Sequence, residues 1–473
     1  MPIFTDEAIY MRWAQIALQD ASWRFISLTD GKQPLFIWAS MILMKFVEDP
    51  LVAGRTISVV SGLFTLVGLW LLSFELFKNK KIAFLSSLLY VFYPFAQVYD
   101  RMAIMDSMLG TFTVWALYIT VRLVRKINLS YSYSLGFAIA GGILTKSSAF
   151  FSIYLLPFSL LLFDFKKKNR LLRLGKLILL FIVSIVVAEL LYNVLRLSPF
   201  FSTVTTKNAL FVYPISEWII HPFTFFLGNL TGLVNWSVTY LSTYFLLILI
   251  SLLFYKKYFK EKLLLLAYFL LPFVALALFG RIIFPRFIFF MTLFLLPLAA
   301  VGLYEIQSFF SFKFKKASVV LQIIIIVIFL SYPGYTIFKL ITDPANAPIA
   351  DADSGQYLNN WTAGFGVNET IDFLKKESKD KKIFVGTEGT FGLMPYSLEL
   401  YLVQNKNIVI KGYWPVDEKL PQEAIDYSKK MPSYFIFYQP QHQVLASDFK
   451  VNLIFKQQQG KSDYYYRLYK IIP

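Results

Sequence analysis

The sequence predicts a polytopic α-helical membrane protein that carries a soluble α/β domain at its C-terminal end. Hydrophobic residues make up 57% of the 473 positions, 49 of them Phe, and the mean hydropathy is +0.57. These values exceed those of ordinary soluble domains. Apolar runs of about 20 residues, the length that crosses a bilayer, recur up to about residue 340. Beyond that point no run could span a membrane.

We expect about ten spans and an even number of crossings, which returns the chain to its starting side. The fourth and fifth are short enough to be tilted or incomplete. The expected spans lie near 55–77, 82–99, 107–124, 133–149, 150–164, 177–196, 236–255, 262–279, 285–304 and 317–339.

The net charge of +17 concentrates in short hinges between the apolar runs. The hinges contain Lys78, Lys80 and Lys81; Arg122, Arg125 and Lys126; Lys166 to Lys168, Arg170, Arg173 and Lys176; Lys256, Lys257, Lys260 and Lys262; and Lys313, Lys315 and Lys316. The positive-inside rule predicts that each is cytoplasmic, so both chain ends lie outside. A nucleic-acid-binding protein would instead gather its basic residues on one folded face. No nucleic-acid partner is therefore expected.

The start of the chain lacks the segment that an external N-terminus requires. Neither a signal peptide nor an earlier span precedes "FTDEAIY", which begins at Phe4. We therefore expect a first transmembrane helix to be missing. The segment 34–47 is too short to span comfortably, and its amphipathic ends favour a helix in the outer interface.

The composition changes at about residue 341. The Pro/Ala/Asp-rich stretch "TDPANAPIADADSGQ" predicts a linker. Strand-like runs such as "KIFVG", "NIVIK" and "SYFIFY" then alternate with helical ones, which favours a small α/β domain with a mostly parallel sheet. The predicted domains are therefore 1–340 in the membrane and 341–473 outside it. The "DAD" at 351–353 mimics a metal-binding motif, but in a linker we interpret it as a polar hinge.

Charged residues that hydropathy does not explain gather on the outer side of this topology. They are Asp6, Glu7, Asp30, Lys32, Asp100, Arg101, Asp106, Lys146, Arg281 and Arg286. Charges beside or within spans are costly and usually mark function. Simpler roles exist: Lys146 could snorkel, the two arginines could anchor to lipid phosphates, Asp100 and Arg101 could form a surface pair, and Asp6 and Glu7 could start a helix. Their shared side favours a site for a phosphate-containing lipid.

The order of these motifs resembles a known family. "DEA", "GKQPLFIW", an "AxxD", an in-membrane "LTK" and "FPRF" follow one another as they do in the GT-C-fold, polyprenyl-phosphate-sugar-dependent glycosyltransferases. That family includes protein O-mannosyltransferases and the aminoarabinose transferases that modify lipid A. The resemblance covers roughly residues 1–340, and "WTAGFG" at 361–366 is similar to bacterial relatives.

The resemblance implies roles for eight residues. Asp6 aligns with the essential first-loop acid and Asp106 with the second-loop acid. Lys32 and Lys146 correspond to basic positions at the lipid phosphate, and Arg281 and Arg286 to cations near the carrier's head group. Glu7 and Arg101 are expected beside them in substrate binding, with Arg101 holding an acid in place. Metal use varies within the fold, which leaves a divalent metal ion as an alternative. The sequence has no Cys, only two His, His221 and His442, and no clear ligand set, so we expect no metal or other cofactor.

The implied activity is transfer of a sugar from a polyprenyl-phosphate donor to a lipid, glycan or protein acceptor on the extracytoplasmic face of the cell membrane. An acid takes the acceptor's proton or supports an oxocarbenium-like centre, and cations offset the charge on the departing phosphate. A secondary transporter also has many spans and buried charges, but it often shows repeated halves and mid-membrane charges. A structural anchor for the α/β domain would leave Lys146 unexplained.

Overall fold

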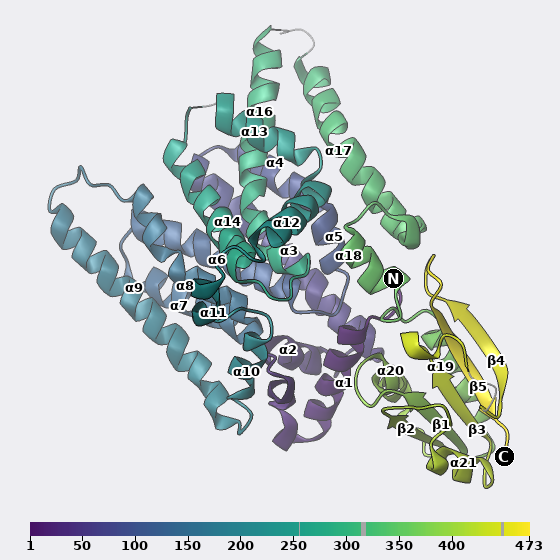
Figure 1. Cartoon of the computed structure of the whole chain (residues 1–473). Helices are drawn as coiled ribbons and strands as arrows, with labels where there is room; N and C mark the ends of the chain where they lie inside the picture. Colours follow the sequence, from purple (N-terminus) through teal and green to yellow (C-terminus); the bar gives the residue numbers. More distant parts are fainter. Residues whose placement is uncertain (255, 314–317, 446–448) are drawn as a thin grey trace.

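A computed structural model shows a bundle of helices with a small mixed sheet at one end (Figure 1). The structure describes residues 1–254, 256–313, 318–445 and 449–473. The bundle begins with α1 (Thr5–Gln19), α2 (Leu35–Leu43), α3 (Pro50–Phe77), α4 (Lys80–Val91), α5 (Pro94–Tyr99), α6 (Asp106–Arg125) and α7 (Leu129–Thr145). It continues with α8 (Phe151–Tyr154), α9 (Arg170–Tyr192), α10 (Thr203–Ala209), α11 (Ile215–Ile220), α12 (Phe226–Leu241), α13 (Tyr244–Phe254), α14 (Phe259–Phe279), α15 (Arg286–Thr292), α16 (Leu296–Lys313) and α17 (Ser318–Thr342).

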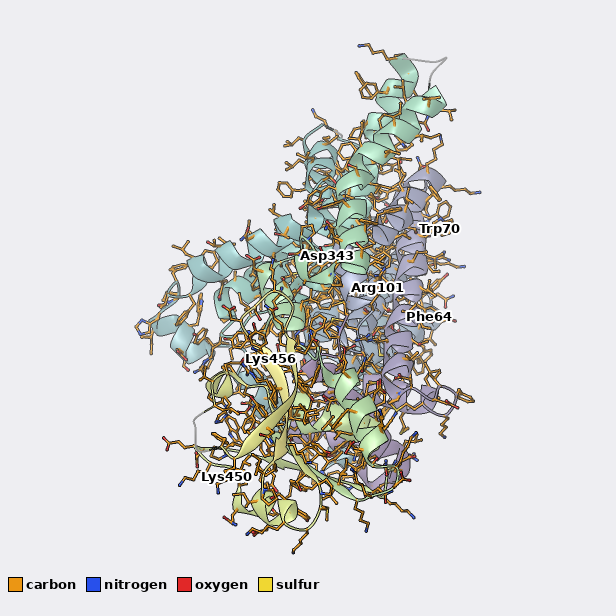
Figure 2. All side chains as sticks on the ribbon, turned by 90° about the vertical axis from the view of Figure 1, so that its right-hand side faces the viewer. Phe64, Trp70, Arg101, Asp343, Lys450 and Lys456 are labelled. Carbon is orange, nitrogen blue, oxygen red and sulfur yellow. The ribbon has the colours of Figure 1, made fainter. Side chains whose placement is uncertain are left out.

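Six helical segments among the described residues are long and apolar enough to cross a membrane. They are Pro50–Phe77, Asp106–Arg125, Arg170–Leu197, Phe259–Phe279, Arg286–Lys313 and Val319–Thr342. The pair α12 and α13, which bends by 100° at its break, makes a seventh if it is one span. Large apolar side chains such as Phe64, 55% exposed, lie along the outer surface of α3 (Figure 2). Such a surface suits contact with lipid.

Three of the expected spans are interrupted. The run 82–99 is divided into α4 and α5, because Tyr93 is extended and Pro94, the first residue of α5, has no N–H to continue the helix. The run 236–255 is bent at Ser242, whose φ is +46°. The fifth expected span, 150–164, consists of short helical pieces that include α8. The count of ten crossings therefore stays a prediction.

The basic hinges lie together at one end of the bundle. Glu75 forms ion pairs with Lys78, Arg122 and Arg125, and Arg125 also pairs with Glu261. The last turn of α16 and the start of α9 lie at the end of the bundle away from the sheet (Figure 1). Of the last hinge, Lys313 is described, whereas Lys315 and Lys316 lie outside the described residues. The described hinge residues therefore share one end of the bundle, and their cytoplasmic orientation stays a prediction of the charge rule.

The predicted sidedness can be tested by labelling, because the chain has no native Cys. Cysteines at the exposed positions Lys80 and Lys167 should resist an impermeant thiol reagent in intact cells, whereas one at exposed Gln404 should react. Permeabilised cells, in which all three should react, provide the control. Labelling of Lys80→Cys in intact cells would reverse the predicted orientation.

The sheet domain contains β1 (Ile383–Glu388), β2 (Ile408–Tyr413), β3 (Ser433–Phe437), β4 (Val451–Gln458) and β5 (Tyr465–Ile471). The strand order is β2-β1-β3-β5-β4. The first three strands are parallel, whereas β4 and β5 form an antiparallel hairpin that joins β3. The sheet is thus mixed rather than mostly parallel, because the short turn between β4 and β5 allows only an antiparallel pairing. Helices α19 (Val367–Glu377), α20 (Leu393–Leu402) and α21 (Gln422–Ser428) complete the domain.

The sheet domain packs directly against α1. Arg12 Nε lies 2.8 Å from Glu399 Oε2 of α20, and Gln15 donates to the carbonyl of Leu400 at 2.9 Å. At the start of α1, Thr5 donates to the carbonyl of Thr362, and Phe4 forms an isolated β-bridge with Ala363. The first helix is therefore held between the bundle and the C-terminal domain.

Candidate functional site

Asp6 and Arg286 form an ion pair at the sheet end of the bundle. Phe4 is extended and its N–H donates to Glu7 Oε2 at 3.0 Å, which starts α1 at Thr5 and places Asp6 in the first turn. Arg286 is the first residue of α15, after Pro285. Its Nη1 donates to Asp6 Oδ2 at 2.6 Å. The Arg286 side chain is 11% exposed, and its Nε has no hydrogen-bond partner among the described residues.

Asp106 and Lys146 form the second pair. Asp106 begins α6, and Lys146 directly follows the last residue of α7. Lys146 Nζ donates to Asp106 Oδ1 at 2.7 Å, and the two side chains are 21% and 4% exposed. Lys146 Nζ also lies 4.8 Å from the centre of the Phe287 ring, which is 6.0 Å from Arg286 Cζ. The Phe287 ring therefore joins the two pairs into one site, which we call the paired-charge site.

Lys32 adds a third cation. Its Nζ lies 5.5 Å from the centre of the Phe211 ring, in the segment between α10 and α11. The loop that carries Lys32 is held in place by contacts on both sides of this residue. Gln33 donates to Ser147 at 2.6 Å, and Asp30 pairs with Lys207 of α10 at 2.5 Å. Lys207 of α10 and Phe211 therefore lie beside the loop that carries Lys32.

The charges of this site shift the ionisation of its members outside the membrane spans. Burial favours the neutral form of Asp6, but the positive charges of Arg286 and Lys32 outweigh it and lower the pKa of Asp6. Burial lowers the pKa of Lys32, and the charge of Asp6 partly opposes that shift. Asp6 is thus a carboxylate at neutral pH, because its cationic partners stabilise the negative charge.

The other predicted site residues make their contacts elsewhere. Glu7 is fully buried; it binds Arg55 Nε at 2.9 Å and the N–H of Ala103 at 2.7 Å. Arg101 donates to Gln97 at 2.7 Å. Arg281 is exposed, with Cζ 5.8 Å from the centre of the Tyr213 ring. The structure therefore brings together five of the predicted site residues: Asp6, Lys32, Asp106, Lys146 and Arg286. Glu7, Arg101 and Arg281 do not join them.

Asp353 was not expected to be buried. The "DAD" segment was interpreted as a polar hinge, and this was wrong for Asp353, which is 0% exposed in α18 (Asp351–Ser354). Its Oδ2 accepts hydrogen bonds from Tyr99 at 2.7 Å and Tyr240 at 2.5 Å. Burial raises the pKa of Asp353 to about 7. The burial of Asp353 depends on two tyrosines that are distant in the sequence, so the residues around Asp353 gave no signal for it.

Within the described ranges, no three His, Asp or Glu side chains are grouped so that they could hold a metal ion. The acids of the paired-charge site are bound instead to Arg286 and Lys146. The arrangement is suited to an anion that can replace the carboxylates on the two cations, because both arginine and lysine bind phosphate oxygens through charge-assisted hydrogen bonds.

Comparisons with known proteins agree on the fold. Residues 31–192, less than half of the chain, match the family model "Dolichyl-phosphate-mannose-protein mannosyltransferase". Among solved structures, ArnT from Cupriavidus metallidurans is similar over 100% of this chain and 94% of its own, with TM-score 0.55 and 14% identity. The same protein bound to undecaprenyl phosphate gives TM-score 0.55 and 12% identity over 100% and 95%.

The archaeal oligosaccharyltransferase AglB from Archaeoglobus fulgidus, in complex with an inhibitory peptide and a dolichol-phosphate, matches with TM-score 0.56 and 13% identity. The alignment covers 92% of this chain and 66% of AglB. No curated protein matches the chain by sequence. Because the solved structures match along nearly the whole chain, the polytopic helical architecture with a C-terminal sheet domain has the GT-C fold.

Proposed function

We propose that this chain is an integral-membrane glycosyltransferase that moves a hexose or pentose from a polyprenyl-phosphate-linked donor to an acceptor on the extracytoplasmic face. The paired-charge site carries the proposal: two acids and three cations meet at one end of the bundle. The fold supports it, because ArnT is described with undecaprenyl phosphate and AglB with a dolichol-phosphate. Both carriers are polyprenyl phosphates.

The cations supply the first half of the chemistry. The donor phosphate would replace the carboxylates on Arg286 and Lys146, whose side chains are only 11% and 21% exposed. In such a site, cations stabilise the negative charge that builds on the phosphate as the bond to the sugar breaks. Lys32 adds a further positive charge near Asp6.

Asp6 supplies the second half. When the phosphate neutralises Arg286, the pKa of Asp6 rises and the carboxylate becomes a better proton acceptor. The acceptor hydroxyl then gives its proton to Asp6 while its oxygen bonds to the anomeric carbon. The electron pair of the old carbon–oxygen bond leaves with the phosphate. Asp106 orients the acceptor or balances charge. An acceptor that is already an anion needs no base, and Asp6 would then act through its charge alone.

Transfer of radiolabel from a polyprenyl-phosphate sugar in purified membranes tests the proposal. We expect label in a lipid, glycan or protein acceptor and release of the polyprenyl phosphate. A transporter would move labelled donor between compartments without forming a product. Transport is less favoured, since the site charges come from α1, α6, α15 and the end of α7 rather than from the bent pair of α12 and α13.

The pH dependence should report the charge of Lys32. Burial places the pKa of Lys32 below its usual 10.5, so the charge is present at neutral pH and is lost as pH rises through that lowered value. The kcat/KM for donor should therefore fall at alkaline pH, with an inflection below 10.5. Lys32→Arg should move the inflection upward, because arginine stays charged. Lys207→Arg, whose partner is Asp30, is the matched control. An unmoved inflection in Lys32→Arg would remove Lys32 from the site.

A further inference from the structure

The sheet domain contains a polar cleft. It has a volume of about 940 Å³ and is lined by residues that follow β2, such as Trp414 and Asp417, and by Gln441 and His442, which follow β3. Both strands are parallel to β1, which lies between them. In open parallel sheets, ligands bind outside the carboxyl ends of the strands, beside the point where strand order reverses. The cleft has that position.

A buried acid orients His442 in this cleft. Glu388, the last residue of β1, is 0% exposed and accepts from the N–H groups of Tyr438 and Gln439 at 3.2 and 3.0 Å. Its other oxygen accepts from Gln441 at 3.0 Å and is bonded to His442 Nδ1. Because a carboxylate surrounded by donors is an acceptor, the network assigns the His442 proton to Nδ1.

This assignment leaves Nε2 of His442 as an acceptor without a partner among the described residues. The His442 residue is 8% exposed, and its ring packs between Phe437 and Phe449, with centroid distances of 5.3 and 5.9 Å. It nevertheless lines the cleft. A histidine that is held in one orientation, lines a cleft and keeps a free acceptor indicates a ligand that donates a hydrogen bond.

The lining indicates the class of ligand. Trp414 is 56% exposed and offers an aromatic surface. The charged residues of the lining, Asp417, Glu418 and Lys419, give no excess of positive charge for a phosphate or other anion. An aromatic surface next to hydroxyl-binding side chains suits a pyranose ring, which has an apolar C–H face and a polar rim of hydroxyls.

The cleft is distinct from the paired-charge site. Side chains along β1 and β3 alternate between the two faces of the sheet. Ile383 and Ile436 belong to the core that continues to α1, whereas Phe435 and Phe437 pack with another group on the opposite face. That second group includes Val416, Leu420 and Phe449, which also line the cleft.

We propose that this cleft is an accessory binding site for a neutral saccharide, with the sugar stacked on Trp414 and one hydroxyl donating to His442 Nε2. The site lies on the face of the sheet away from α1, so it would hold a glycan without taking part in the transfer step. It does not depend on the proposed transferase activity, because binding is measured without a donor.

The test measures binding of neutral hexasaccharides of glucose, mannose and N-acetylglucosamine to the full chain in lipid nanodiscs by saturation-transfer NMR. At least one should bind, and Trp414→Ala should weaken it about tenfold or more, the effect of about 1.4 kcal/mol. His442→Gln should act in the same direction. Trp23→Ala, a change at a 43% exposed tryptophan outside the domain, should have no effect.

Three results would overturn the proposal. The first is no binding by any hexasaccharide at concentrations up to about 10 mM, about tenfold above the Kd of about 1 mM that marks weak binding. The second is binding that Trp414→Ala and His442→Gln leave unchanged. The third is preference for a sugar phosphate over the neutral sugar. Because Trp414 is exposed, its replacement should not disturb folding, which thermal unfolding of the variant checks.

Discussion

Asp6→Asn is expected to lower the kcat of sugar transfer by about 10²- to 10⁴-fold, the usual contribution of a general base. The amide keeps the shape of the side chain and an oxygen that can accept from Arg286, which lies 2.6 Å away in the native protein. It cannot take up a proton from an acceptor hydroxyl. The measurement is initial-rate transfer from a radiolabelled polyprenyl-phosphate sugar at saturating donor.

Asp30→Asn is the matched control for this variant. Like Asp6, Asp30 pairs with a cation, in this case Lys207, and both side chains are about one quarter exposed, at 26% and 27%. We expect only a small loss of activity, because exposed ion pairs contribute little. If Asp6→Asn kept wild-type turnover at normal abundance, Asp6 would be no more than an acid that stabilises the first turn of α1.

The composition of the paired-charge site was largely predictable from the sequence. Asp106, Lys146 and Arg286 stand out because each lies beside or within an apolar run, where an unpaired charge is costly. Their pairing was not predictable. Asp106 and Lys146 are 40 residues apart, and Asp6 and Arg286 are 280 apart. Only the packing of α1, α6 and α15 brings these groups together.

Two neighbouring acids illustrate why the partners of the site residues could not be predicted from the sequence. Asp6 and Glu7 are adjacent, but successive residues of a helix point about 100° apart, so they face different surroundings. Asp6 meets Arg286, whereas Glu7 meets Arg55 and is fully buried. A sequence pattern cannot distinguish them until the neighbours of α1 are known.

The membrane helices were also only partly predictable from the sequence. Hydropathy identified α3, α6, α9, α14 and α17, because length and apolar content decide such spans. The break before Pro94 has a sequence signal, the missing N–H of proline. The bend at Ser242 has none, because neither Gly nor Pro stands there. Strand β5 was not predicted either, since its tyrosines alternate with charged residues rather than with a clear apolar face.

Removal of the two cations should weaken use of the donor more than any other change outside Asp6. Arg286→Met and Lys146→Met should each raise the donor KM about tenfold or more, the scale of one charge-assisted contact. If both cations bind the same phosphate, the double variant should lose less than the product of the two single effects. Donor kinetics on all three variants measure this coupling.

Lys146→Met also has a structural cost that must be separated from donor binding. Asp106 is 4% exposed, and loss of Lys146 leaves its carboxylate buried without its partner. Breaking such a pair typically costs about 3–5 kcal/mol. We therefore expect a lower Tm for Lys146→Met and a recovered Tm for Lys146→Met with Asp106→Asn, which removes both charges. Donor use should stay weak in that stable double variant. Recovery of donor use together with Tm would instead assign Lys146 to holding Asp106 and leave Arg286 and Lys32 to bind the phosphate.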